Sequence, residues 1–75
     1  MDSLKDSDFV GKCCRANRII FLNSNYDLPK KSIVIVLEIK HNIEYSIYKT
    51  VKLLFDGKVD YFSTSYELNY WLEKL

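Results

Sequence analysis

Apolar and polar positions are patterned most clearly in residues 32–40, which are β-branched and apolar over most of their length. The side chains of a strand point alternately to its two faces. This rule places Ile33, Ile35, Leu37 and Ile39 on one face, and Val34, Val36, Glu38 and Lys40 on the other. The pattern predicts a strand over 32–40 that begins buried on both faces and ends half exposed.

Residues 51–62 predict a β-hairpin, because an Asp-Gly pair separates two runs of β-forming residues. We expect Gly57 to have a positive φ, which glycine adopts without a penalty from a Cβ atom. A two-residue turn would set Leu53 opposite Asp60. We favour a three-residue loop with Gly57 as a bulge, which sets Leu53 opposite Val59 and moves Asp60 to the polar face.

Residues 43–55 fit two patterns. Apolar residues recur at intervals of four from Ile43 to Phe55, which suits a helix, and they also alternate over much of the stretch, which suits a strand. The abundance of Ile, Tyr, Thr and Val favours one long strand, bent near residues 49–50. The alternative is an α+β fold in which residues 43–50 are helical.

The last residues predict a capped amphipathic helix. Thr64 and Glu67 have the spacing of a capping box. Apolar residues then recur at helical intervals, at Leu68, Trp71, Leu72 and Leu75, which predicts about three helical turns. The alternative is a single helical turn followed by a short closing strand.

The remaining segments are less regular. Residues 1–8 are polar and predict a flexible N-terminus or a short helical turn, and residues 9–75 predict a single small β-rich domain. Within it, residues 12–22 predict an extended segment with a break near residues 16–17. Residues 23–31 predict a loop, because they combine Asn, Ser and Asp with a proline.

These elements predict a mainly β fold with a short C-terminal helix, arranged as a small barrel or as an antiparallel meander. Several motifs follow a fixed order: an early Gly11, Ile-Val-Ile-Val-Leu-Glu-Ile at 33–39, Tyr-x-x-Tyr-Lys at 45–49, Val-Lys-Leu-Leu-Phe-Asp-Gly-Lys-Val-Asp-Tyr-Phe at 51–62, and the element 66–75. This order resembles that of small Src-homology-3-like barrel proteins encoded by phages. One difference is that Lys31-Ser32 stand where such proteins usually have a glycine.

The chain is rich in aromatic residues, with six Tyr, four Phe and one Trp among 75 residues. Most of them should serve the core, since a domain of this size buries little surface. Exposed aromatic side chains, however, contribute much of the binding energy at protein interfaces. We therefore expect a protein partner to contact Tyr26, Tyr45, Tyr48, Tyr66, Tyr70 and Trp71.

The net charge of +1 is unevenly distributed, because residues 12–58 carry nine basic and four acidic side chains while both ends are acidic. A basic segment can bind the phosphates of nucleic acid, although spaced lysines also simply protect strand edges. The alternative function is therefore a nucleic-acid-binding barrel, with Tyr45 or Tyr48 stacked on bases. Its phosphate contacts would be Lys12, Arg15, Arg18, Lys30, Lys31 and Lys40.

Catalytic and metal chemistry find little support in the sequence. The adjacent Cys13 and Cys14 and the single His41 are too few for a tetrahedral zinc site. We expect two free thiols in a reducing compartment, one pointing into and one out of a strand pair. The chain has no Gly-rich phosphate loop and no carboxylate pair in an acid–base context, so we expect no enzymatic activity, no metal and no cofactor.

The sequence thus predicts a non-enzymatic protein-interaction module. In the phage setting that the resemblance implies, its partner would be a virion protein or a host protein that it inhibits. The expected location is then the host cytoplasm or the virion. No apolar run approaches the roughly 20 residues of a membrane-spanning helix, and self-association of the chain is compatible with the pattern.

Overall fold

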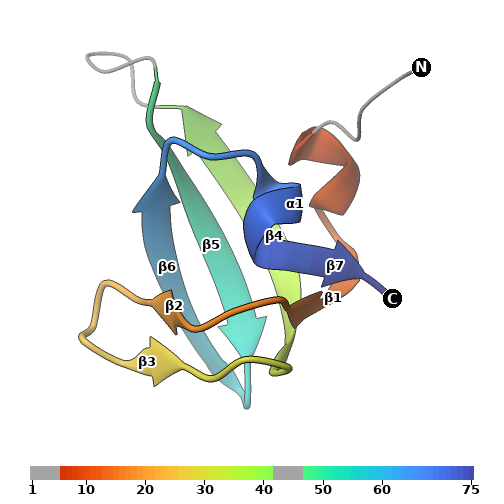
Figure 1. Ribbon diagram of the computed structural model, residues 1–75, viewed down its shortest axis with the longest axis vertical. Helices are drawn as coiled ribbons and strands as arrows, with labels where there is room; N and C mark the ends of the chain where they lie inside the picture. Colours follow the sequence, from red (N-terminus) through yellow and green to blue (C-terminus); the bar gives the residue numbers. More distant parts are fainter. Residues whose placement is uncertain (1–5, 42–46) are drawn as a thin grey trace.

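A computed structural model describes residues 6–41 and 47–75. Among these residues the chain is mainly β, with antiparallel sheets and one short α-helix near the C-terminus (Figure 1). The elements in chain order are the 3₁₀-helix η1 (Asp6–Phe9), β1 (Cys13–Ala16), β2 (Ile20–Phe21), β3 (Asp27–Leu28), β4 (Ile33–His41), β5 (Lys49–Phe55), β6 (Lys58–Thr64), α1 (Leu68–Trp71) and β7 (Leu72–Lys74).

Five strands form one antiparallel sheet in the order β6-β5-β4-β1-β7. β1, from the start of the chain, pairs with β4 on one side and with the last strand β7 on the other. β2 and β3 form a separate two-stranded sheet, which lies beside the lower part of β6 in Figure 1. The two ends of the chain are therefore held together by strand pairing, while the β2–β3 hairpin extends the fold beyond the main sheet.

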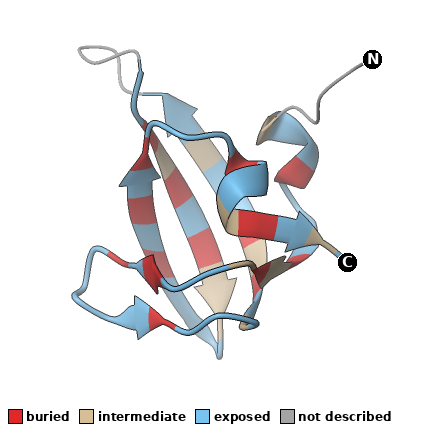
Figure 2. Cartoon of the chain, in the orientation of Figure 1, coloured by how far each residue is buried: buried red, intermediate tan, exposed pale blue. Residues whose placement is uncertain are grey.

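Only one face of the main sheet is buried, and buried and exposed residues alternate along β5 and β6 (Figure 2). The apolar core contains side chains from the strands together with Phe9 of η1 and Leu68 of α1. Leu68 and Leu72 are almost fully buried, so the helical turn and the last strand close the core. Fold class and the main elements therefore follow the sequence pattern.

The expected strand over 32–40 is confirmed as β4, but its expected burial on both faces is wrong. Val34 and Val36 are buried, whereas Ile33 on the opposite face is 50% exposed. The register against β5 shifts between Val36 and Glu38, so that one extra residue is accommodated. Because of this irregularity Val36 and Ile39, an odd number of residues apart, both pack against the core.

The hairpin is confirmed, but the favoured three-residue loop is wrong. Leu53 lies opposite Asp60, and a two-residue turn joins the strands. Asp56 and Gly57 have φ angles of 50° and 72°, the combination of a type I′ turn. The prediction failed because it placed Asp60 in solvent. Asp60 is buried, and its carboxylate accepts hydrogen bonds from the backbone amide of Tyr61 and from the Ser24 hydroxyl.

The three-turn C-terminal helix and its capping box are also corrected. Helix α1 has one turn, the next residues form β7, and the cap position is occupied by Glu67 without a side-chain hydrogen bond. The alternative of a single turn with a closing strand is the observed one. The segment pairs with β1 and does not continue the helix that its periodicity predicts. The pairing buries Leu72 and provides hydrogen bonds for the backbone of this segment.

Two boundaries differ from the sequence-based expectation. The expected domain start at residue 9 falls inside η1, whose first residue Asp6 already makes polar contacts with the rest of the fold. The long strand expected over 43–55 begins at Lys49, and residues 47–50 are not helical, whereas residues 42–46 lie outside the described part of the chain.

The turn geometry predicts that Gly57→Ala destabilises the protein. Nothing lies within 4 Å of a Cβ atom built on Gly57, so the cost comes from its positive φ alone. We expect a loss of about 1 kcal/mol in the free energy of unfolding, measured by urea denaturation. A variant as stable as the wild type would contradict this account of the turn.

Lys31 occupies the other informative left-handed position. Its φ is 77°, and its backbone amide donates to the carbonyl of Ala16 at 2.8 Å. Left-handed geometry costs a non-glycine residue about 1–2 kcal/mol, and glycine would remove this cost. Part of the gain is cancelled because glycine also gives the unfolded chain more conformational freedom. We expect Lys31→Gly to stabilise the protein by about 0.5–1 kcal/mol in thermal and urea unfolding.

The matched control for this substitution is Lys30→Gly, since Lys30 is not among the residues with positive φ. This control should lose stability, because glycine there only adds freedom to the unfolded chain. If Lys31→Gly lowers the free energy of unfolding as Lys30→Gly does, the strain at residue 31 is not significant.

Candidate protein-interaction surface

Three aromatic side chains gather at the C-terminal helical turn, and we call Tyr66, Tyr70 and Trp71 together with Arg18 the aromatic surface. Their ring centroids lie 4.6 Å apart for Tyr66 and Tyr70, and 4.9 Å apart for Tyr70 and Trp71. Trp71 also packs edge-on against Phe62 at 5.7 Å. The contact between Trp71 and Phe62 therefore anchors the cluster to β6. Tyr66 and Tyr70 remain 56% and 39% exposed.

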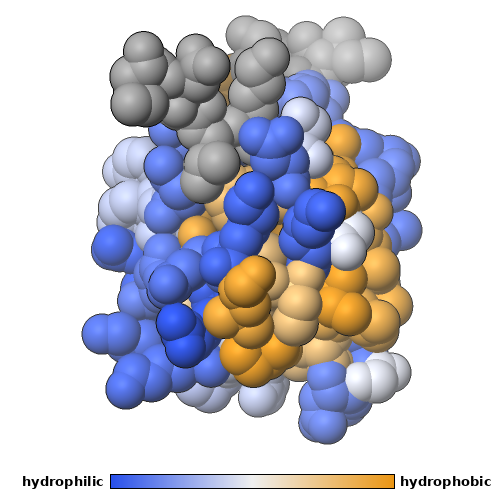
Figure 3. All heavy atoms as spheres, turned by 90° about the vertical axis from the view of Figure 1, so that its right-hand side faces the viewer, coloured by the Kyte–Doolittle hydropathy of each residue, from blue (hydrophilic) through white to orange (hydrophobic). Residues whose placement is uncertain are grey.

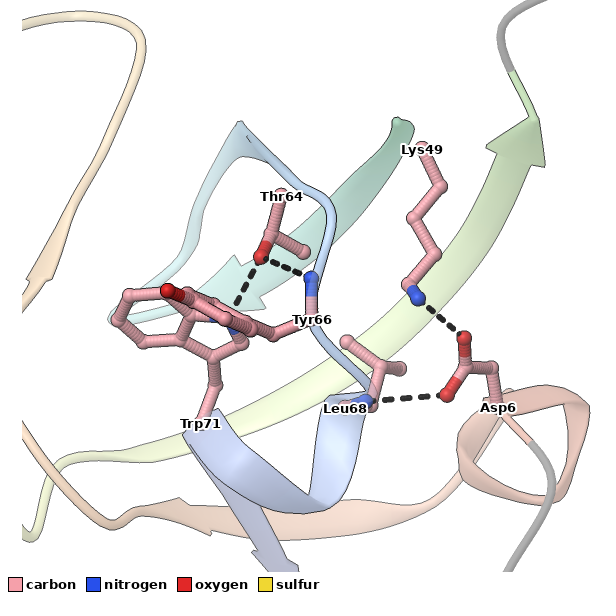
Figure 4. A network of polar contacts seen from close by, with 6 residues as sticks. All are labelled: Asp6, Lys49, Thr64, Tyr66, Leu68 and Trp71. Carbon is pink, nitrogen blue, oxygen red and sulfur yellow. Dashed lines mark hydrogen bonds and ion pairs between the residues drawn. The ribbon is translucent and has the colours of Figure 1, made fainter. Parts of the chain in front are cut away.

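The hydroxyl of Thr64 fixes the base of this cluster. Its Oγ1 accepts hydrogen bonds from the indole Nε1 of Trp71 at 2.8 Å and from the backbone amide of Tyr66 at 3.0 Å (Figure 4). Thr64 itself is buried at the end of β6. Because one atom holds both the Trp71 indole and the backbone of Tyr66, the indole ring and the backbone at Tyr66 are fixed in the free protein.

Residues 17 and 18 hold the cluster from the other side. The guanidinium of Arg18 lies 3.8 Å from the centroid of the Tyr70 ring, and its Nε donates to the Tyr70 carbonyl at 3.0 Å. Asn17 donates from its side chain to the carbonyl of Asn69 and from its backbone to that of Trp71. These bonds satisfy carbonyls that a one-turn helix leaves without internal partners.

A buried ion pair supports the opposite end of α1. One oxygen of Asp6 accepts from the backbone amide of Leu68 at 3.0 Å, and the other lies 2.6 Å from the ammonium of Lys49 (Figure 4). The side chains of Lys49 and Asp6 are only 9% and 19% exposed. Asp6 therefore links η1, β5 and α1, and it determines where the aromatic turn sits on the core.

The structure brings together only part of the expected partner-binding set. Tyr66, Tyr70 and Trp71 form the cluster. Tyr26 instead stacks on Phe55, with ring centroids 5.6 Å apart and planes inclined by 16°. Tyr48 is exposed just before β5 and makes no ring contact among the described residues, and Tyr45 lies outside the described part of the chain.

The six basic residues expected to contact phosphate come from several different elements of the fold. Lys31 and Lys40 lie near opposite ends of β4, and Lys30 precedes Lys31 in the turn after β3. Arg15 forms an exposed ion pair with Glu73 at 3.3 Å. Arg18 is committed to Tyr70, and Lys12 is exposed just before β1.

Sequence reasoning missed the residues that position the surface. The sequence pattern identifies Thr64 as a helix cap, and its hydroxyl does accept a hydrogen bond from a nearby backbone amide. The second donor to this hydroxyl is the indole of Trp71, which comes from the next element. The sequence pattern assigns Arg18 to phosphate, and it places Asp6 in a polar N-terminal segment that is flexible or forms a short helical turn. Nothing in the local sequence indicates these contacts, because Arg18 and Asp6 meet α1 from more than 50 residues away.

A second exposed area lies on the outer face of the main sheet. Strand pairing sets Cys13, Ile35, Leu54 and Val59 side by side in one row across β1, β4, β5 and β6. Figure 3 shows apolar surface on the side of the molecule that carries β1 and β7. The row is bordered by an exposed ion pair between Lys52 and Glu38, and these two residues line a shallow hollow of about 230 Å³.

The two cysteines differ in environment, as expected for a strand residue pointing in and its neighbour pointing out. Both are free, with Cys13 exposed and Cys14 buried. Burial raises the pKa of the Cys14 thiol, and neighbouring Cys13 adds to the rise, while Lys74 opposes it. Cys14 is therefore the less reactive of the two thiols, and its side chain serves as a small core residue.

Residues 6–41 and 47–75 are the part of the chain in which metal ligands and membrane-spanning helices can be located. No group of three or more His, Cys, Asp or Glu side chains in these ranges is arranged to hold a metal ion. None of the helices there has the length and apolar character needed to cross a membrane. No protein-family model, curated protein or solved structure matches the chain.

The ion pair under α1 predicts a large loss of stability for Asp6→Ala. This change leaves the ammonium of Lys49 buried without its partner and removes the acceptor for Leu68, so we expect a loss of about 2–4 kcal/mol. Urea denaturation measures it. Adding Lys49→Met should restore much of the loss, because the unpaired charge is then gone.

Glu38→Ala provides the matched control, since the Glu38–Lys52 pair is nearly half exposed at 3.7 Å. Its removal should cost less than about 1 kcal/mol. Equal losses for Asp6→Ala and Glu38→Ala would show that Asp6 does not hold the N-terminal segment to α1.

Proposed function

We propose that this protein is a non-enzymatic interaction module that binds another protein through the aromatic surface. The observation that carries the proposal is the contact chain from Arg18 through Tyr70 to Tyr66 and Trp71, built on the buried Thr64. Aromatic and arginine side chains are enriched among the residues that dominate interface energies. Here four such side chains are adjacent.

The arrangement suits binding because contacts within the protein already restrict these side chains, so they lose less conformational entropy when a partner binds. Trp71 and Tyr66 share the Thr64 hydroxyl, and the Arg18 side chain is bonded to the helix backbone. A partner that covers Tyr66 and Tyr70 would therefore bury apolar ring surface without ordering these groups first. The tyrosine hydroxyls and the guanidinium provide polar contacts at the rim of the same surface.

The biological setting that we propose is that of a phage protein. In this setting the partner is a virion protein or a host protein that the module inhibits, in the host cytoplasm or the virion. The proposal of this setting rests on the likeness in sequence pattern to small Src-homology-3-like barrels; the order β6-β5-β4-β1-β7, with a short helix before the last strand, bears on the architecture alone. A shared fold by itself does not specify chemistry.

Nucleic-acid binding is the weaker proposal. It needs basic side chains that follow one path across the protein surface, so that they can contact successive phosphates of the nucleic acid. Instead Lys31 and Lys40 lie near opposite ends of β4, and Arg15 is paired with Glu73. No specific arrangement among the described residues favours this function over protein binding.

We expect Tyr70→Ala to weaken the protein complex by more than about 1–2 kcal/mol, or roughly tenfold in Kd. The partner is first captured with the tagged protein, and the affinity of the purified partner is then measured by calorimetry for wild type and variant. Thermal unfolding checks that the variant is folded. Tyr48→Ala is the matched control, because Tyr48 is exposed but lies outside the aromatic surface.

The competing proposal is tested with the same proteins. Lys30→Ala/Lys31→Ala should leave the protein complex nearly unchanged and affect mainly its association rate. A titration with single- and double-stranded DNA and RNA at increasing salt completes the comparison. Submicromolar, salt-sensitive nucleic-acid binding that is lost in the double lysine variant, with no effect of Tyr70→Ala, would overturn the proposal.

A further inference from the structure

A hollow of about 570 Å³ lies at the far end of the hairpin from the aromatic surface. It is lined by residues of the segment 23–26, between β2 and β3, and by residues at the turn end of β5 and β6. Three aromatic residues and one carboxylate line it, namely Tyr26, Phe55, Tyr61 and Asp60. We call it the hairpin hollow.

The walls of the hairpin hollow are fixed by hydrogen bonds within the chain. The backbone amide of Asn23 donates to the carbonyl of Tyr61 at 2.8 Å, and its side-chain amide donates to the Tyr61 hydroxyl at 3.1 Å. Tyr26 is held by its stack on Phe55 and by the bond from the Leu22 amide to its carbonyl. The aromatic rings are therefore in place without a ligand.

The charge of Asp60 gives the hollow its chemical preference. Its carboxylate is bonded to two neutral donors, the hydroxyl of Ser24 and the amide of Tyr61. The ion pairs among the described residues do not include Asp60. A carboxylate in a buried residue without a cationic partner disfavours phosphate or carboxylate ligands and favours a cation.

Aromatic rings beside a carboxylate suit a particular class of cation. The faces of tyrosine and phenylalanine attract an ammonium whose charge is spread over apolar groups, because such a cation loses little hydration on binding. Lys58 also lines the hollow, but it is exposed and forms no ion pair with Asp60. Its ammonium opposes the entry of another cation, although it is not paired with the carboxylate.

We propose that the hairpin hollow binds an alkylammonium group, with the cation beside Asp60 and against the rings of Tyr26 and Phe55. This site is separate from the aromatic surface, and it stands whether or not that surface binds a protein. The group is either a free small molecule or the modified lysine side chain of another protein, since both present the same chemistry.

The test compares choline with 3,3-dimethylbutan-1-ol, its uncharged isostere, on the wild-type chain. Two-dimensional NMR follows the resonances of Tyr26, Phe55 and Tyr61 during titration at constant ionic strength. Choline should give saturable shifts in the millimolar range, with a Kd about fivefold or more below that of the isostere. Equal binding of the two, or no saturable shift with choline, overturns the proposal without any variant being needed.

Variants then test the assigned roles. Asp60→Asn retains an acceptor for Tyr61 but loses the charge, so it should raise the Kd of choline to about that of the isostere. Lys58→Gln should lower it several-fold, because it removes the opposing charge. Tyr70→Ala should leave it unchanged. Asp60→Asn that folds, judged by its NMR spectrum, and binds choline as the wild type does would overturn the role of the carboxylate.

The two sources are separated by a capped peptide that contains trimethyllysine. A Kd for the peptide well below that of choline supports a protein side chain as the ligand, and equal values support a free small molecule. The proposed protein-binding function is measured separately through Tyr70, which does not line the hairpin hollow. Failure of one proposal therefore leaves the other standing.

Discussion

The fold depends on one constraint, which is that the short chain forms a covering layer over only one face of its main sheet. Phe9, Leu68 and the inward residues of the strands fill a single core, and α1 with β7 closes it. The outward residues Ile33 and Val59 stay exposed. A domain of this size buries only about 60% of the surface that its unfolded chain exposes, so the outer face of the main sheet stays open to solvent.

The sequence predicts what depends on neighbours along the chain. The strand 33–41, the Asp-Gly turn with positive φ at Gly57, and the division of Cys13 and Cys14 between outside and inside all follow from local rules. It fails where a distant group decides the outcome. Asp60 was assigned to solvent because its partner Ser24 comes from another loop, and a helix was assigned over Leu72 because its pairing with β1 cannot be read locally.

The candidate site shows the same division. Tyr66, Tyr70 and Trp71 could be selected from sequence because they are close to one another in the chain. Arg18 and Asp6 could not be assigned their roles, since each contacts α1 from the opposite end of the sequence. What holds an exposed ring in one orientation is therefore a property of the whole fold. The rings are exposed on one side and anchored on the other, and both conditions are needed for a rigid binding surface.

One feature of the hairpin hollow also affects how the protein behaves at high concentration. β6 is an edge strand of the main sheet, and edge strands can pair with another chain and start aggregation. Both backbone groups of Tyr61, at the centre of β6, are already bonded, the amide to the Asp60 carboxylate and the carbonyl to the Asn23 amide. An incoming strand would have to break both bonds. The Asp60 carboxylate, whose burial the predicted register did not include, thus also hinders the pairing of a further strand at this edge.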